Sequence, residues 1–332
     1  MLKFPIVFMS LMLLACGQQN AKNNNATTVT ASKPAAAATN VPEFNADSAY
    51  TYVEKQVAFG PRVPNSEAHK ACANYLADEL KRFGAKTFVQ EANLTAYDGT
   101  RLSCYNIIGS YNPDMDNRVL LFAHWDSRPY SDHDPDPANH RKPLDGADDG
   151  ASGVGALLEI ARQLQMKDPG MGVDIIFFDA EDYGTPEFVD DYKPDTWCLG
   201  TQFWTRNTHV PNYRAKYGIL LDMVGGRGAT FFKEYQSVRA AAPIVEMVWS
   251  AARNLGYGKY FINADGGAVT DDHQYVISGL GIPCIDIINY DPDSEKGFPE
   301  YWHTQRDNMS NIDRETLKAV GQTVLHVIYN EK

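Results

Sequence analysis

Short apolar runs alternate with longer segments of helical periodicity along most of this chain. Apolar residues recur at helical spacing in segments 46–59, 66–83, 151–166, 240–255, 272–280 and 313–329. Apolar runs bounded by turn residues predict strands at 102–111, 118–124, 173–179, 218–224 and 282–288. Segment 173–179 is almost wholly apolar, as expected of a strand buried on both faces. The alternation predicts an α/β fold, a three-layer α/β/α sandwich around a mostly parallel, mixed β-sheet.

The first 42 residues depart from this pattern. Residues 1–16 hold one Lys and an apolar run of about ten residues, which is shorter than a helix that spans a bilayer. The run ends in Leu13-Leu14-Ala15-Cys16, which resembles a bacterial lipobox and implies cleavage before Cys16 and lipidation of its thiol. An ordinary signal peptide with an incidental cysteine is the alternative. No Asp follows Cys16, so we expect a lipid-anchored protein of the bacterial cell envelope, in the outer membrane or periplasm rather than the inner membrane.

The chain after Cys16 divides into a polar segment and one long globular segment. Residues 17–42 are rich in Asn, Ala, Thr and Gln, cannot bury a core, and predict a flexible tether. Residues 43–332 show no repeat and no further boundary, so we expect one domain there. The segment around Asp132, His133 and Asp134 contains prolines without periodicity and predicts a solvated loop.

Composition narrows the class of protein. The chain has 332 residues, 44% of them hydrophobic, which is enough for a sizeable core and excludes a wholly disordered chain. Its net charge of -12 disfavours nucleic acid as a partner. Four cysteines follow Cys16 without a CxxC pair, so a thiolate zinc site is disfavoured and buried free thiols are expected. The excess of carboxylates could be surface charge or could include metal ligands.

Acidic and imidazole side chains gather at the ends of the predicted strands and just before one predicted helix. They are His124, Asp149, Glu181, Asp182, Asp222 and His303. A single Asp at such a place usually caps a helix or closes a turn, and one His alone could be a core residue. Ligands bind at the carboxyl ends of parallel strands, where so many acids together need a positive charge among them. Oxygen and imidazole ligands without thiolates indicate a catalytic zinc site.

Five motifs then carry a resemblance that covers residues 46 to 332. The runs HWDS, GADDGASGVGALLE, IIFFDAED, LLDMVG and WHT followed by Asp307 resemble the zinc aminopeptidase superfamily. Within it, the run FPEYWH at 298–303 and the run DDH at 271–273 resemble the glutaminyl cyclase branch. The resemblance implies an enzyme that cyclises N-terminal Gln of peptides to pyroglutamate and releases ammonia. It also implies one zinc ion per chain, and we expect a monomer.

The resemblance assigns roles to individual residues. It implies zinc ligands Asp149, Asp182 and His303, although animal cyclases carry Glu at the position of Asp182. Glu181 would be the acid/base, with Asp222 and Asp271 as a hydrogen-bonded acidic pair beside it. The substrate pocket would be walled by Trp302 and Phe298, and Trp197 is a further pocket candidate.

Ligand count leaves a second enzyme open. A dinuclear zinc aminopeptidase could hold one zinc with His124, Asp149 and Asp222 and the other with Asp149, Asp182 and His303. Glu181 would then activate water for peptide hydrolysis. In the cyclase, His124 would instead be a hydrogen-bonding partner behind the metal site. A non-enzymatic lipoprotein is a third class, which the retention of every acid disfavours.

Overall fold

The computed structural model describes residues 41–191 and 193–331. The predicted signal segment, Cys16 and nearly all of the predicted tether lie outside the described residues. Within the described part, no helix has both the length and the apolar character needed to cross a membrane.

Six strands form the central sheet, in the order β1-β2-β4-β3-β5-β8. Their bounds are Lys86–Thr95 (β1), Arg101–Tyr111 (β2), Arg118–His124 (β3), Gly172–Phe178 (β4), Gly218–Asp222 (β5) and Cys284–Ile288 (β8). Strands β4, β3, β5 and β8 run parallel to one another, whereas β2 is antiparallel to both β1 and β4. The predicted mostly parallel, mixed sheet is therefore confirmed. Two short strands, β6 (Phe231–Lys233) and β7 (Phe261–Asp265), form a separate parallel pair.

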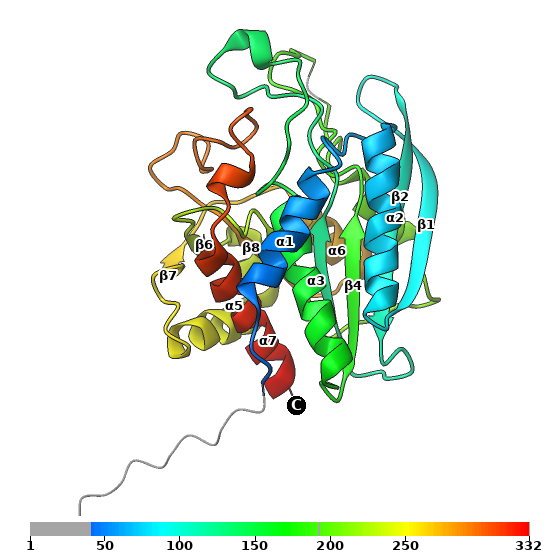
Figure 1. Ribbon diagram of the computed structural model, residues 1–332, viewed down its shortest axis with the longest axis vertical. Coiled ribbons are helices and arrows are strands. Elements are labelled where there is room, and N and C mark those ends of the chain that lie inside the picture. Colours follow the sequence, from blue (N-terminus) through cyan, green and yellow to red (C-terminus); the bar gives the residue numbers. More distant parts are fainter. Residues whose placement is uncertain (1–40, 192, 332) are drawn as a thin grey trace, which may run out of the picture. The chain divides into compact units, whose positions relative to one another are not determined.

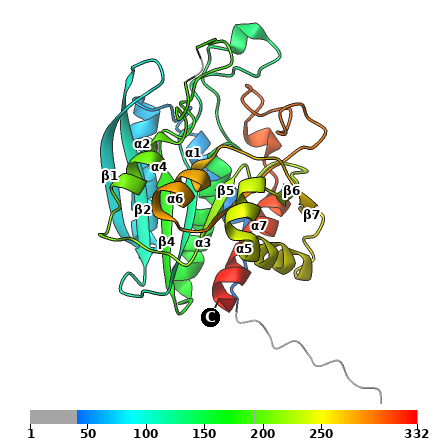
Figure 2. The same ribbon diagram turned by 180° about the vertical axis from the view of Figure 1, so that it is seen from behind.

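Helices cover both faces of the sheet, as predicted. Figure 1 shows one face under α1 (Ala46–Val57), α2 (Glu67–Arg82), α3 (Ala151–Met166) and α7 (Arg314–Asn330). Figure 2 shows α4 (Leu199–Arg206) and α6 (Asp272–Leu280) on the opposite face. Helix α5 (Tyr235–Asn254) packs against β8, and two 3-10 turns complete the body, η1 (Pro137–Asn139) and η2 (Met309–Asn311).

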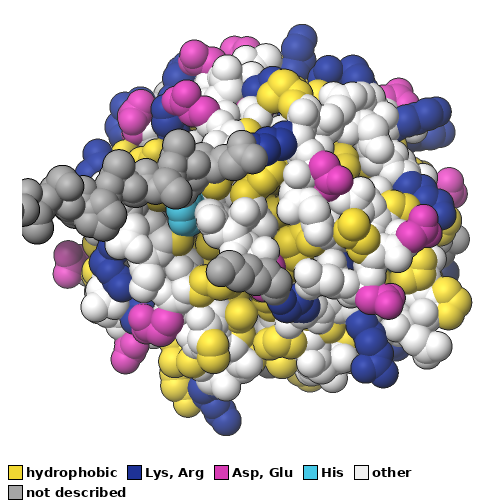
Figure 3. Space-filling model, turned by 90° about the horizontal axis from the view of Figure 1, so that it is seen from below, with side chains coloured by type: hydrophobic (Ala, Val, Ile, Leu, Met, Phe, Trp, Pro, Cys, Tyr) yellow, Lys and Arg dark blue, Asp and Glu magenta, His cyan; other side chains and the backbone are white. Residues whose placement is uncertain are grey.

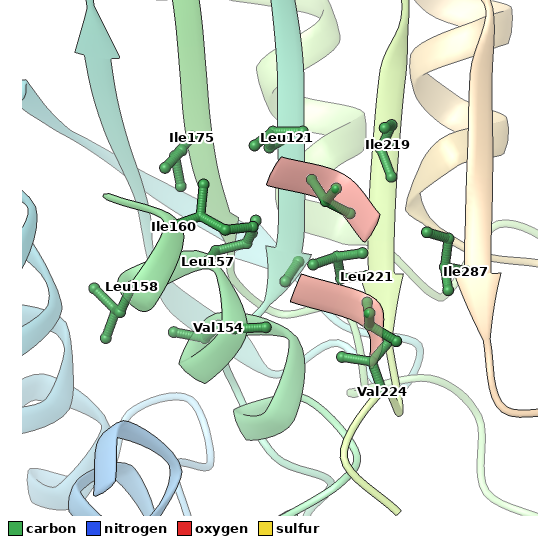
Figure 4. Close-up of a cluster of buried hydrophobic side chains, with 14 of the residues drawn as sticks. Leu121, Val154, Leu157, Leu158, Ile160, Ile175, Ile219, Leu221, Val224 and Ile287 are labelled. Carbon is green, nitrogen blue, oxygen red and sulfur yellow. The ribbon is translucent and has the colours of Figure 1, made fainter. Parts of the chain in front are cut away.

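The core is divided by the sheet into two layers. Leu121 and Ile175 point into the layer with α3, whose Val154, Leu157 and Ile160 pack against the strands (Figure 4). Alternate positions on the same strands, such as Leu120 and Ile176, point into the layer with α4 and α6. Because neither face of these strands meets water, apolar residues stand at consecutive positions, which is the pattern that the sequence displays.

The parallel strands direct their carboxyl ends toward the loops at the top of Figure 1. The opposite end, seen in Figure 3, carries acidic and basic side chains dispersed among polar and apolar ones. The candidate chemistry thus lies at one end of the sheet, on the loops that leave β3, β4 and β5.

Candidate metal centre and active site

The residues singled out by the sequence converge on one cavity. His124 ends β3, Glu181 and Asp182 follow β4, Asp222 ends β5, and Asp149 stands two residues before α3. The cavity has a volume of 390 Å³. Nine of the predicted residues line it: Asp149, Glu181, Asp182, Trp197, Asp222, Asp271, Phe298, Trp302 and His303.

Three of these side chains form a group suited to a metal ion. The ligand atoms of Asp149, Asp182 and His303 all lie within 4.8 Å of one another. His303 Nε2 is 3.4 Å from Asp149 Oδ2 and 3.3 Å from Asp182 Oδ1. Tetrahedral zinc with bonds of about 2.0–2.2 Å holds neighbouring ligand atoms about 3.4 Å apart, which matches these separations. Both Asp182 oxygens are buried without a hydrogen-bond partner, which fits a role as metal ligands.

The electrostatics of the group also favour a cation. Burial and then the charge of Asp149 raise the pKa of Asp182 to about 6. Burial also opposes ionisation of Asp149, but hydrogen bonds from His124 and His303 bring the pKa of Asp149 below its ordinary value. Two carboxylates this close repel each other in a buried site. A divalent cation among them offsets that repulsion and keeps both ionised.

A buried ion pair stands behind the His303 ligand. Asp132 Oδ1 lies 3.7 Å from His303 Nδ1, on the side of the ring away from Asp149 and Asp182. Arg128 binds Asp132 through two hydrogen bonds of 2.7 and 2.6 Å and donates a third to the backbone oxygen of Asp182 at 3.0 Å. Such a carboxylate behind a metal-binding imidazole fixes the orientation of the ring. The prediction of a solvated loop here is wrong for Asp132 and Asp134, because both are buried against the loop that carries His303.

His124 contacts two of the acidic side chains of the site. Its Nε2 is within hydrogen-bond distance of Asp222 Oδ1, at 3.2 Å, and is 3.0 Å from Asp149 Oδ1. His124, Asp149 and Asp222 also form a possible three-ligand group of their own. The imidazole packs tightly against Gly150, where a Cβ would lie 2.9 Å from His124 Cε1 and where φ is +88. The glycine after Asp149 therefore permits both the turn into α3 and the close approach of the imidazole.

Glu181 occupies the position expected of an acid/base. It is buried, and its Oε1 accepts a hydrogen bond of 3.1 Å from the Cys198 thiol. Burial raises the pKa of Glu181 well above its ordinary value, the charge of His124 opposes this, and the charges of Asp182 and Asp271 add to it. A carboxyl group with a raised pKa suits both the uptake and the release of a proton near neutrality.

The resemblance implied a hydrogen bond between Asp222 and Asp271, which stays a prediction because it needs a proton shared by the two acids. Asp222 pairs with His124, and Asp271 accepts from the backbone amide of Asp272 at 2.6 Å. Burial raises the pKa of Asp271 well above its ordinary value, and the charge of Asp222 raises it further. The two carboxyls are thus electrostatic neighbours, close enough for the charge of Asp222 to raise the pKa of Asp271.

Aromatic side chains enclose the metal-binding group. The Trp302 ring stacks on the His303 ring, with centroids 3.7 Å apart, and contacts Phe298 at 4.4 Å. The Trp197 ring lies nearly parallel to His303 at 6.0 Å, with the Arg128 guanidinium over its face at 4.6 Å. All three predicted aromatic residues therefore surround the group. Sequence reasoning missed Arg128 and Cys198, which are each distant along the chain from the groups they contact.

Comparison with known proteins identifies the family of this chain. A model of peptidase family M28 matches residues 106–328. The crystal structure of Tannerella forsythia glutaminyl cyclase is 73% identical, with a TM-score of 0.87, and the match covers 88% of this chain and 100% of that one. A Zn-dependent exopeptidase structure from Parabacteroides distasonis is 79% identical, with the same TM-score and coverage. Glutaminyl-peptide cyclotransferase of Bos taurus is 27% identical over 296 residues, 79% of this chain and 76% of its own. The chain belongs to peptidase family M28.

Proposed function

We propose that this protein is a zinc-dependent glutaminyl cyclase. It converts the N-terminal Gln of peptides and proteins to pyroglutamate and releases ammonia. The observation that carries the proposal is the placement of Glu181 beside the Asp149, Asp182 and His303 group within an aromatic-walled cavity. The high identity to a named bacterial glutaminyl cyclase supports the same reaction.

The chain's own residues divide the work of this reaction. Asp149, Asp182 and His303 would hold a zinc ion, which would supply Lewis-acid polarisation of the substrate γ-carbonyl. Glu181 accepts a proton from the α-amine as the new nitrogen–carbon bond forms, and it returns a proton to the departing ammonia. The charge of Asp222 affects the ionisation of Asp271. These two acids would together orient the attacking nitrogen.

The aromatic walls explain why cyclisation would prevail over hydrolysis. The nucleophile is part of the substrate, so the reaction needs no water. Trp302, Phe298 and Trp197 line the cavity, and these rings would exclude bulk solvent where they pack against a bound glutaminyl side chain. The same rings hold the substrate so that its amine and γ-amide lie close together.

A dinuclear zinc aminopeptidase is the second candidate. The His124, Asp149 and Asp222 group favours it, as does the similarity to a structure named as an exopeptidase. In the one-zinc cyclase, His124 Nε2 would instead stay hydrogen-bonded to Asp222 Oδ1, which lies 3.2 Å away.

One experiment separates the two enzymes. Purified protein is incubated with Gln-peptides and, separately, with Leu-arylamides, and zinc per chain is measured on the same sample. We expect ammonia, a peptide product whose mass is lower by that of one ammonia molecule, and no free Gln. We also expect about one zinc ion per chain. Release of Leu with unchanged Gln-peptides would refute the cyclase.

We further propose that residues 43–332 form a single catalytic domain that a lipid on Cys16 holds at the cell envelope. The lipobox at residues 13–16 and the polar segment 17–42 support this. Replacing Cys16 with Ser should move the protein from the membrane fraction to the soluble fraction of the envelope. Sedimentation analysis of the soluble Cys16→Ser protein measures its molecular mass and so tests the expected monomer.

A further inference from the structure

The Cys198 thiol lies directly against the carboxylate that would move the proton. Its Sγ is 3.1 Å from Glu181 Oε1, and the thiol donates to that oxygen. In the part of the chain that the structure describes, the Glu181 carboxylate makes no other hydrogen bond. Its remaining neighbours include Asp182 and Asp271, which repel it. The thiol is therefore the group that can fix the rotation of this side chain.

The backbone holds the two residues opposite each other. Cys198 N donates to Glu181 O at 2.9 Å, Leu199 N to Ala180 O at 3.0 Å, and Gly200 N to Asp179 O at 3.1 Å. A Cβ on Gly200 would lie 2.1 Å from Asp179 O, so the two segments can approach this closely only at a glycine. The thiol contact is thus set by three consecutive backbone hydrogen bonds.

The local backbone is strained on both sides of this contact. Cys198 has φ 55 and Ala180 has φ 52, which are left-handed values that residues with a Cβ seldom adopt. Such conformations persist only where surrounding interactions hold them, and they gather at functional sites. Trp197, next to Cys198, forms one wall of the cavity. The strained segment therefore presents a pocket wall and the thiol together.

The thiol acts as a donor rather than as a reactive group. Burial raises the pKa of Cys198 well above its ordinary value, and the charge of Glu181 raises it further. A thiol with such a pKa stays protonated and is a poor nucleophile. It can therefore donate to Oε1 throughout the reaction without exchanging its proton.

We propose that Cys198 is a positioning residue that holds Glu181 through Oε1 and so reserves Oε2 for the substrate proton. This inference rests on the proposed cyclase function. The α-amine proton moves to Oε2 as the ring nitrogen–carbon bond forms, and a proton leaves from Oε2 to ammonia as the carbon–nitrogen bond of the amide breaks. The sulfur–hydrogen bond stays intact at every stage.

Three variants test the proposal on the zinc-loaded enzyme. Cys198→Ala removes the donor, Cys198→Ser retains one, and Cys284→Ala removes another buried free thiol, far along the chain on β8. We expect Cys198→Ala to lower kcat for a Gln-peptide by about 5- to 10-fold, with KM and zinc content unchanged. Cys198→Ser should restore kcat to within about 2-fold of the wild type, and Cys284→Ala should leave kcat unchanged.

Infrared spectroscopy of the S–H stretch gives a readout that does not depend on turnover. The Cys198 band, assigned by subtracting the spectrum of Cys198→Ser, should shift when Glu181 is replaced by Gln. An unshifted S–H band overturns the proposal. A kcat of Cys198→Ala equal to that of the wild type also overturns it, as does loss of zinc from the Cys198→Ala protein. If the wild type forms no pyroglutamate, the proposed function fails, whereas the infrared result still decides whether the thiol binds Glu181.

Discussion

Removal of the His124 imidazole separates a one-zinc enzyme from a two-zinc enzyme. His124 is buried, and its Nε2 lies 3.2 Å from Asp222 Oδ1. In the one-zinc cyclase, His124→Ala deletes a hydrogen bond to a buried carboxylate, which is worth about 1.5–3 kcal/mol. If that bond supports the transition state, kcat falls by about 10- to 150-fold while zinc stays at one per chain. KM should change little, because His124 does not line the cavity.

The assay follows ammonia release from a Gln-peptide and measures zinc by mass spectrometry on the same sample. Truncation of a buried ring also leaves a cavity and lowers the free energy of unfolding. Rates are therefore normalised to the folded fraction, measured by circular dichroism. His124→Gln is the matched control, because its amide can place an N–H near the position of Nε2 and should recover part of the lost kcat.

Zinc stoichiometry gives the result that would refute this reasoning. If the wild type binds two zinc ions and His124→Ala binds one, then His124 is a metal ligand. The hydrogen bond to Asp222 would then be replaced by coordination in the loaded enzyme. Unchanged kcat in His124→Ala would equally show that the contact with Asp222 has no part in the reaction.

Three further predictions concern the acid/base, the turn into α3 and acid stability. Glu181→Gln should lower kcat by about 10²- to 10⁴-fold and retain zinc, and a loss below 10-fold would remove Glu181 from the mechanism. Gly150 has φ +88, and a Cβ there would lie 2.8 Å from Asp126 O. Gly150→Ala should therefore lower the free energy of unfolding, measured by urea titration, by about 1–3 kcal/mol. An unchanged midpoint of the titration would contradict this. Burial opposes ionisation of Glu234, but its hydrogen bond with His273 lowers the pKa of Glu234 from 4.5 to about 2. Its ionised form therefore stabilises the fold above pH 4.5, by about 3 kcal/mol, and this stability is lost as the pH falls to about 2. Glu234→Gln should flatten that loss in acid denaturation, and a curve parallel to the wild type would exclude the effect.

The elements that the sequence predicted well are those whose burial is uniform. Segment 151–166 coincides with α3, and the run at 173–179 nearly coincides with β4, because both are packed on almost every side. Strand β1 was missed. It lies at the edge of the sheet, most of its side chains are at least partly exposed, and its polar composition carries no clear period. Its register with β2 is what makes it a strand.

The predicted site residues were found because strand ends are recognisable in a sequence and meet at one edge of a parallel sheet. The residues behind them were missed for a different reason. Arg128 and Asp132 stand in a loop whose local sequence resembles solvated chain. They are buried by segments that are distant along the chain, those of Asp182 and His303. A contact between residues about 170 positions apart has no local signal.

The backbone of the site shows why its geometry lies beyond local rules. Ala180, Met223 and His303 have positive φ values of 52, 47 and 53, and each belongs to or adjoins a predicted functional residue. Local preference disfavours this conformation for all three, so no propensity could have predicted it. Packing of the finished fold must therefore supply the energy that holds these turns. The same turns direct the side chains of Glu181, Asp222 and His303 into the cavity, so the site depends on the whole domain even though its residues are few.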